Sequence, residues 1–288
     1  MRDVATTPAA PREISTARVT VIRPAPRWPH FDLRELWHFR ELLGTLVWRD
    51  VSVRYKQTSI GIAWALLQPL LMTIVFTLVF GKFANFNSKG VPYPIFSYSA
   101  NLAWFYFASA VTLSSVSLVS NRALVTKVYF PRVLLPLASV SVPLVDLFFA
   151  SSILVGMWFW FGVWPNAAIL LAPAFLALAL VTALGVGLFL SAVSVRYRDV
   201  PYAFPFLLSS WMFVSGVIQP IREFPEYAQW VLAFNPMTAV IDGFQWAVIG
   251  TAPPDFAKTM VSVGSTAIFF VVGLWFFRRS EPRFADTI

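Results

Sequence analysis

Cysteine is absent from this 288-residue chain, and charged side chains are scarce. The lack of cysteine excludes disulfides, thiolate nucleophiles and cysteine-ligated metal sites. Charged residues make up 12% of the chain, about half of the roughly 25% that is typical of soluble domains. Because 58% of the residues are hydrophobic and the mean hydropathy is +0.68, the composition predicts an integral membrane protein.

Motifs for catalysis and nucleotide binding are also missing. The chain contains no G-x-S-x-G, H-E-x-x-H or G-x-x-x-x-G-K-[ST] pattern, which would indicate a nucleophile elbow, a zinc site or a phosphate-binding loop. Gly81 and Lys82 lack both the upstream glycine and the following hydroxyl of the last pattern. We therefore predict that the chain is not an enzyme and that it holds no metal or cofactor of its own.

The net charge of +8 would suit a nucleic-acid partner if the cations were gathered on one soluble module. They instead alternate with long apolar runs, as lysine and arginine do in the loops of membrane proteins. We therefore predict no nucleic-acid partner.

Six segments are apolar enough and long enough to cross a bilayer, which takes about 17 to 25 helical residues. Their backbone groups must be satisfied within each segment, so helices are expected. The predicted fold is an all-α membrane protein with a transmembrane domain over residues 58–279. Its expected spans are Ile60–Phe80, Tyr98–Val119, Pro136–Phe161, Ile169–Val195, Val200–Ile218 and Met260–Phe277.

Both chain ends are predicted to differ from this domain. Residues 1–30 are rich in proline and arginine and are expected to form a disordered basic tail. Residues 31–57 show apolar positions at helical spacing with charges between them. They predict an amphipathic helix lying in the membrane interface; an amphipathic helix packed on protein is the alternative. Residues 280–288 are expected to form a cytoplasmic tail.

The cations also predict an orientation. Those on the side of the N-terminus outnumber those on the other side, which are Lys82, Lys89, Arg222 and Lys258. Lysine and arginine are enriched in cytoplasmic loops, so both termini are expected in the cytoplasm. The more numerous set is Arg40, Arg49, Arg54, Lys56, Arg122, Lys127, Arg132, Arg196, Arg198, Arg278, Arg279 and Arg283.

Residues 121–132 form a short basic and apolar segment between the second and third expected spans. A helix from about Asn121 to Phe130 would end before Pro131, because proline disfavours the helical conformation in the preceding residue. Such a helix fits a groove on another protein, although a plain cytoplasmic loop is the alternative. The candidate docking residues are Arg122, Leu124, Val125, Lys127, Val128, Tyr129 and Phe130.

Residues 219–259, between the fifth and sixth expected spans, are too apolar for a free loop and too rich in proline to cross the membrane. We predict two short helices that dip into the outer leaflet while packed on protein. Two helices lying flat on the outer surface are the alternative.

Asp146 is the one ionisable residue predicted well inside a span. Such residues are costly in lipid and often functional; a structural hydrogen bond to a serine or threonine of a neighbouring helix is the alternative. Tyr202, Phe206, Ser209 and Phe213 share one face of the fifth expected span by their spacing. Aromatic rings can stack on the apolar faces of sugars, so this face is a candidate channel lining; packing against lipid or protein is the alternative.

Four stretches resemble signature segments of the type-2 ABC exporter permeases for polysaccharides, the group that includes O-antigen, capsule and teichoic acid exporters. They occur in one order over about residues 31–279, and the proline-rich tail lies outside the resemblance. The stretches are "LVWRDVSVRYKQTSIGIAWALLQPLLMTIVFTLVFG", "NRALVTKVYFPRVLLPLASV", "SVRYRDVPYAFPFLLSSWMFVSGVI" and "FNPMTAVIDGFQWAVIG".

The resemblance implies a homodimer in the bacterial cytoplasmic membrane that exports a polysaccharide, such as lipid-linked O-antigen, through a channel. Two copies of a separate ABC ATPase would bind ATP and Mg²⁺ and supply the energy. Residues 121–132 would be the coupling helix that docks on this ATPase. Residues 31–57 would contact the ATPase and lipid headgroups, and residues 219–259 would be re-entrant helices at the outer mouth.

Two other functional classes remain open from the residues alone. An ion-coupled secondary carrier would need several charged groups within its spans, whereas only Asp146 is found there. A structural membrane protein would need no ATPase.

Overall fold

Helices account for every regular element in the residues that the computed structural model describes, which are 37–56, 61–84, 86 and 90–287. The predicted all-α class is therefore confirmed for these residues, and the predicted tail 1–30 lies outside them. In chain order the elements are α2 (Arg40–Lys56), α3 (Ala63–Phe76) with its π-helical continuation η1 (Thr77–Phe83), α4 (Tyr93–Ser120), α5 (Arg122–Lys127), α6 (Leu134–Ser141), α7 (Pro143–Phe161), η2 (Ala167–Leu171), α8 (Ala172–Arg196), α9 (Val200–Phe213), η3 (Ile221–Glu223), α10 (Glu226–Ala233), α11 (Pro236–Ile249), α12 (Phe256–Ser280), η4 (Glu281–Arg283) and α13 (Phe284–Thr287).

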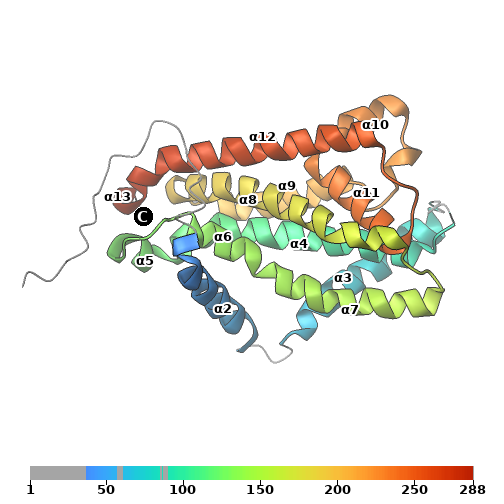
Figure 1. Cartoon of the computed structure of the whole chain (residues 1–288), viewed down its shortest axis with the longest axis horizontal. Helices are drawn as coiled ribbons and strands as arrows, with labels where there is room; N and C mark the ends of the chain where they lie inside the picture. The colour runs from blue at the N-terminus through green and yellow to red at the C-terminus, as the bar shows by residue number, and fades with distance from the viewer. Residues whose placement is uncertain (1–36, 57–60, 85, 87–89, 288) are drawn as a thin grey trace, which may run out of the picture.

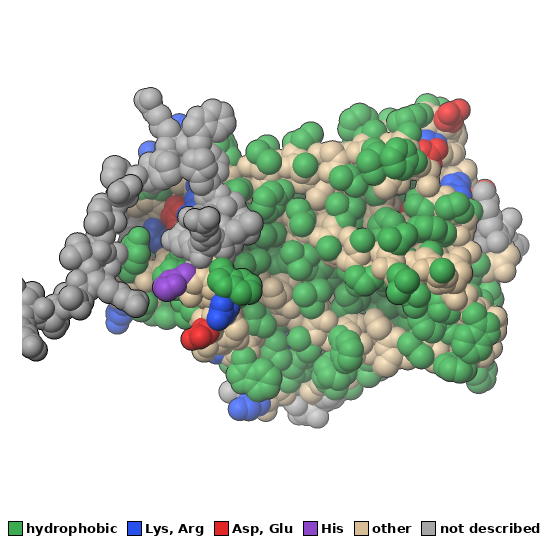
Figure 2. Space-filling view, in the orientation of Figure 1, with side chains coloured by type: hydrophobic (Ala, Val, Ile, Leu, Met, Phe, Trp, Pro, Cys, Tyr) green, Lys and Arg blue, Asp and Glu red, His purple; other side chains and the backbone are tan. Residues whose placement is uncertain are grey.

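Five of these helical stretches are long and apolar enough to cross a membrane, and they coincide with five of the six predicted spans. Most run along the long axis of the molecule (Figure 1). On the face shown in Figure 2, hydrophobic side chains cover the middle of this axis and charged side chains gather toward its ends, as a bilayer requires. The stretches are Ala63–Phe83, Tyr93–Ser120, Leu134–Phe161, Ala167–Arg196 and Phe256–Arg283.

The fifth predicted span is shorter than expected. Helix α9 begins at Val200 but ends at Phe213 instead of Ile218, and its 14 residues reach only about 21 Å at 1.5 Å per residue. The chain turns at Gly216, whose φ of +79° suits glycine. The side-chain amide of Asn235 donates to the carbonyl of Val214 over 3.0 Å, which satisfies a free carbonyl beyond the end of the helix. A sixth span is therefore not confirmed.

The core of the molecule is α4, which packs against α8, α6, α7, α3 and α11. Glycines bring the long helices close together, as small residues do in membrane bundles. A Cβ atom on Gly273 of α12 would lie 2.0 Å from the carbonyl oxygen of Gly185 of α8. One on Gly187 of α8 would lie 2.7 Å from Cβ of Ser114 of α4. Larger side chains at these positions would force α4, α8 and α12 apart.

The segment 219–259 contains the two predicted short helices, α10 and α11. Helix α11 is almost entirely buried and contacts α4, α8 and α12. Its Gln245 amide donates to the carbonyl of Phe96 in α4 over 2.9 Å. Helix α10 exposes apolar side chains, including Tyr227 and Val231. The existence of two short helices is confirmed, whereas their entry into a membrane stays a prediction.

Helix α2, Arg40–Lys56, covers most of the described part of the predicted interface helix, which begins at residue 37. Leu46 is buried and α2 contacts α6, while Trp37 and Trp48 are about 70% exposed at 68% and 73%. The helix itself is confirmed over Arg40–Lys56. Residues 31–36 and 57 lie outside the described residues, and the placement of α2 in a membrane interface stays a prediction.

Candidate functional site

A groove runs between α3, α4 and α9 and encloses a volume of about 780 Å³. Four aromatic side chains supply much of its wall, and five polar side chains lie among them. The aromatic residues are Trp64, Trp104, Phe105 and Phe213, and the polar residues are Arg54, Gln68, Ser109, Thr112 and Ser209.

Hydroxyl groups in the groove are oriented by their own helices. Ser209 donates to the carbonyl of Pro205 over 2.9 Å, and Thr112 donates to that of Ala108 over 2.7 Å. Each hydroxyl oxygen keeps its lone pairs as acceptors. The groove therefore offers aromatic faces and hydrogen-bond acceptors side by side.

The predicted aromatic face of α9 divides between the groove and the outside of the molecule. Ser209 and Phe213 line the groove. Tyr202 and Phe206 do not line it and are 85% and 75% exposed. The two outer aromatics would need a partner molecule or lipid to cover them.

Asp146 forms an ion pair at one end of this groove. It lies in the first turn of α7, and its Oδ2 is 2.8 Å from Nη2 of Arg54 in α2. The hydroxyl of Tyr55 donates to its other oxygen. The alternative of a hydrogen bond to a serine or threonine is therefore replaced by an ion pair and a tyrosine. Asp146 does not stand alone in lipid, because α2 brings a cation to it.

A smaller cavity of about 210 Å³ adjoins the Arg54–Asp146 ion pair and shares Arg54, Trp64 and Gln68 with the groove. Burial raises the pKa of Tyr55 above its usual value, and the hydrogen bond to the carboxylate of Asp146 raises it further, since both favour the neutral phenol. Tyr55 therefore stays a proton donor at any physiological pH. Sequence reasoning singled out Asp146 but missed Arg54, because nothing in the local pattern of either residue indicates the other.

The basic segment 121–132 is a shorter helix than predicted. Helix α5 ends at Lys127, and Val128 is already extended. Val125 and Phe130 are buried in the chain itself, so Phe130 anchors the strand-like end of the segment instead of extending the helix.

Some of the predicted docking residues of this segment are buried and others are exposed. Leu124 is half-buried and packs against the core with Val125. Tyr129 is 76% exposed and Val128 is 52% exposed. Arg122 and Lys127 are also exposed. Four of the seven predicted residues are therefore free to meet another protein, while Leu124, Val125 and Phe130 support the segment.

Two hydrogen bonds brace the segment against other elements. Arg49 of α2 donates to the Asn121 side-chain oxygen over 2.8 Å. The guanidinium of Arg132 donates to the backbone carbonyl of Glu281 after α12, and α13 contacts α5. A movement of the segment 121–132 would therefore be transmitted directly to α2 and to the end of α12.

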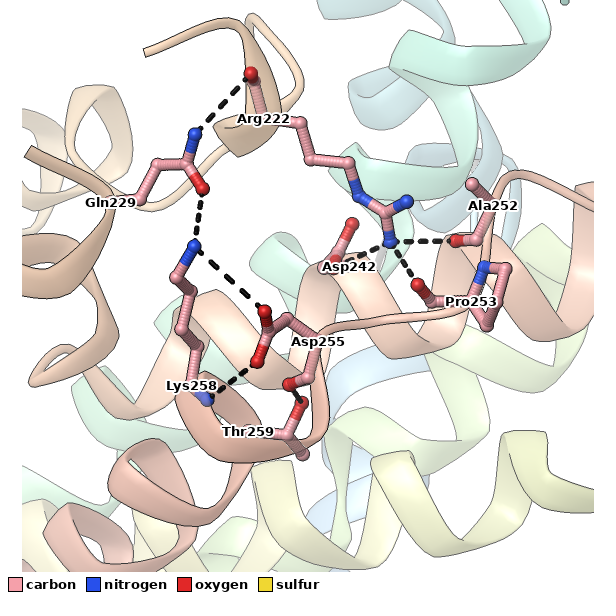
Figure 3. Close-up of polar contacts among 8 residues, drawn as sticks. All are labelled: Arg222, Gln229, Asp242, Ala252, Pro253, Asp255, Lys258 and Thr259. Atoms are coloured by element: carbon pink, nitrogen blue, oxygen red, sulfur yellow. Dashed lines mark hydrogen bonds and ion pairs between the residues drawn. The ribbon is translucent and has the colours of Figure 1, made fainter. Parts of the chain in front are cut away.

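A polar cluster, which sequence reasoning missed, lies at the opposite end of the molecule and joins η3, α10, α11 and the start of α12 (Figure 3). Arg222 donates to the carbonyl of Ala252 over 2.9 Å, and its Nη2 lies 3.6 Å from the carboxylate of Asp242. The ammonium of Lys258 donates to Gln229 over 2.6 Å. Burial raises the pKa of Asp242, and Arg222 opposes this rise. No group of residues suited to a metal ion occurs within the described ranges.

The sequence model of the family described as ABC-2 type transporter matches residues 41–249. This range contains the groove, the Arg54–Asp146 ion pair and α5. The chain belongs to the ABC-2 type transporter family. The chain is also similar to proteins whose names refer to the export of O-antigen or of capsule polysaccharide.

The O-antigen export system permease protein RfbA of Myxococcus xanthus is 26% identical over 258 residues, covering 89% of this chain and 98% of that protein. RfbA of Klebsiella pneumoniae is 23% identical over 257 residues, covering 88% and 97%. The capsule polysaccharide export inner-membrane protein CtrC of Neisseria meningitidis is 24% identical over 243 residues, covering 82% and 89%. Most of the length of each of these relatives is matched by this chain.

Proposed function

We propose that this ABC-2 permease exports a lipid-linked polysaccharide, such as O-antigen, across the bacterial cytoplasmic membrane. The near full-length similarity to permeases of O-antigen and capsule export systems supports this assignment. It favours an ATP-driven exporter over an ion-coupled carrier, and the pairing of Asp146 with Arg54 agrees with that preference. ATP and Mg²⁺ would be bound by a separate ABC ATPase, present in two copies.

The groove between α3, α4 and α9 is the observation that carries the proposal. A polysaccharide must cross an apolar layer of about 30 Å, and each hydroxyl that loses water without a partner costs about 1–3 kcal/mol. Aromatic rings can contact the C–H faces of sugars, and the acceptors of Ser209 and Thr112 can bind sugar hydroxyls. These two features together suit a sliding carbohydrate chain.

The groove is open along one side, so a second copy of the chain would close it into a channel. We therefore place the homodimer contact along α3 and α9. Helix α3 carries an exposed row of side chains, and Tyr202 and Phe206 of α9 are also exposed. The exposed residues of α3 are Trp64, Gln68, Leu71, Ile74 and Val75. In the dimer these two aromatics would extend the wall that Phe213 begins.

We propose six passes through the membrane, with both termini in the cytoplasm. In this topology α9 and the connection that follows it make the fifth pass, and α10 and α11 occupy the outer leaflet. Helix α2 would lie in the inner interface, where its exposed Trp48 and the preceding Trp37 suit the headgroup region. The exposed side of α5, formed by Arg122, Lys127, Val128 and Tyr129, would dock in a groove of the ATPase.

Two measurements test the proposal. An ABC ATPase of the source organism should co-purify with the chain. Deletion of either the ATPase gene or the permease gene should trap the finished polymer inside the cell. Export that persists in both deletion strains would refute the assignment. Normal co-purification with a different exported polymer would keep the transporter class and correct the cargo.

A further inference from the structure

A cavity of about 510 Å³ lies between the last turns of α8 and the end of α12, on the side of the molecule that carries α5 and α13 (Figure 1). Three arginines from separate positions line it, together with the polar side chains of Tyr197, Ser280 and Thr287. The arginines are Arg196, Arg279 and Arg283.

These arginines have no carboxylate partner among the described side chains, whereas their neighbour Arg278 pairs with Glu281 over 2.9 Å. Instead, two of them lie over aromatic rings. The guanidinium carbon of Arg279 is 5.4 Å from the ring centre of Trp275, and that of Arg196 is 5.5 Å from the ring centre of Tyr197. Such cation–π contacts leave the charge of the guanidinium in place. Three positive charges therefore surround one cavity without a carboxylate partner among the side chains that the structure describes.

Apolar surface continues from this cavity toward the middle of the two helices. Phe276 and Val193 line the cavity itself. Phe189 of α8 and Val272 of α12 are exposed beyond it. The rings of Phe189 and Phe276 are 4.8 Å apart. The site thus has a charged end and an apolar path along the helices, which is the pattern of a phospholipid.

Close packing of α8 and α12 explains where the cavity forms. The two helices touch at Gly185 and Gly273, where no side chain fits between them. The arginines follow beyond this contact, at the ends of both helices. Basic pockets between membrane helices on the cytoplasmic side suit anionic headgroups.

We propose that this cavity, the arginine pocket, binds the headgroup of an anionic phospholipid of the inner leaflet. Arg196, Arg279 and Arg283 would bind its phosphate, and the acyl chains would lie over Phe189, Phe276 and Val272. The inference rests on the proposed membrane orientation. It adds a lipid site that is separate from the groove proposed for the polysaccharide.

The pocket is tested with the full chain purified in a neutral detergent, without ATPase or polymer. Binding of phosphatidylglycerol, phosphatidylcholine and inorganic phosphate is measured by native mass spectrometry. The triple variant Arg196→Gln, Arg279→Gln and Arg283→Gln should weaken phosphatidylglycerol binding about a hundredfold at low salt, because each cation near a membrane surface contributes about 1 kcal/mol and 1.4 kcal/mol is a factor of ten. Arg198→Gln, an exposed arginine outside the pocket, should change it less than twofold.

Each other outcome overturns the lipid assignment. Equal phosphatidylglycerol binding by wild type and triple variant would place the lipid elsewhere. Displacement of the lipid by millimolar inorganic phosphate would make this a phosphate site. In a separate co-purification with the ATPase, loss of the complex by a triple variant whose lipid binding is unchanged would make the arginines a protein contact.

If the triple variant does not fold, Arg283→Gln alone should still weaken phosphatidylglycerol binding about fivefold, and an unchanged affinity would count against the proposal. Failure of the lipid site leaves the polysaccharide export assay unaffected, so the two proposals are tested separately.

Discussion

Removal of the Asp146 carboxylate should destabilise the fold, because Arg54 and Tyr55 both depend on it. The side chains of Arg54 and Asp146 are 37% and 16% exposed, so the pair lies between a fully exposed and a fully buried ion pair. Exposed pairs contribute about 0–1 kcal/mol, and breaking a buried pair costs about 3–5 kcal/mol. We therefore expect Asp146→Ala to lower the free energy of unfolding by about 2 kcal/mol.

A double-mutant cycle with Arg54→Ala and Asp146→Ala isolates the interaction between the two side chains. Reversible unfolding in mixed SDS and dodecyl maltoside micelles should give a coupling energy of at least about 1 kcal/mol, within the range for residues in contact. Asp50→Asn is the matched control, because Asp50 also pairs with an arginine of α2, Arg49, at 2.7 Å with more exposed side chains. It should cost less than about 0.5 kcal/mol. A coupling energy near zero would refute the ion pair.

Three further predictions concern docking, topology and transport. The substitutions Val128→Asp and Tyr129→Asp should abolish co-purification with the ATPase, because a charge buried in an interface without a partner costs several kcal/mol. An unchanged yield of the complex would contradict the proposed docking surface. A cysteine at Asp255 should react with an impermeant maleimide in intact cells, whereas cysteines at Thr126 and Ser280 should not; the chain has no native cysteine to add background. Labelling at Thr126 would show that the topology is reversed. A cysteine at Ser88, which lies outside the described residues, is also expected to be labelled from outside. Phe206→Ala and Phe213→Ala should reduce export but leave the dimer yield and ATP hydrolysis normal. A bulky thiol reagent on the Ser209→Cys variant should block export. Normal export by both alanine variants would place the channel elsewhere.

Long apolar runs allowed five spans to be predicted from the sequence, because a membrane helix needs nothing beyond its own residues to satisfy its backbone. The end of α9 could not be predicted in the same way. Residues 214–218 are as apolar as the helix before them, and the turn depends on Gly216 and on Asn235, which lies 21 positions from Val214. A pattern within one segment carries no information about such a contact.

In the candidate site, too, single residues could be predicted from the local sequence but their distant partners could not. Asp146 could be flagged as an acid in an apolar run, but its partner Tyr55 is 91 positions away. The residues of α5 could be named as a group, whereas their division into buried Val125 and exposed Tyr129 depends on how the segment packs on the rest of the chain. Sequence reasoning therefore located the chemistry more reliably than the partners.

The attachment of α9 differs between its two ends. At its far end the Trp211 ring packs edge-on against Phe107 at 5.3 Å and its indole donates to Asn235 over 2.9 Å. At its near end Tyr202 is almost fully exposed, and Pro205 removes one backbone hydrogen bond of the helix between these ends. We expect α9 to pivot about Trp211, so that sugar units of unequal width pass without any change in the packing of α4, α8 and α12.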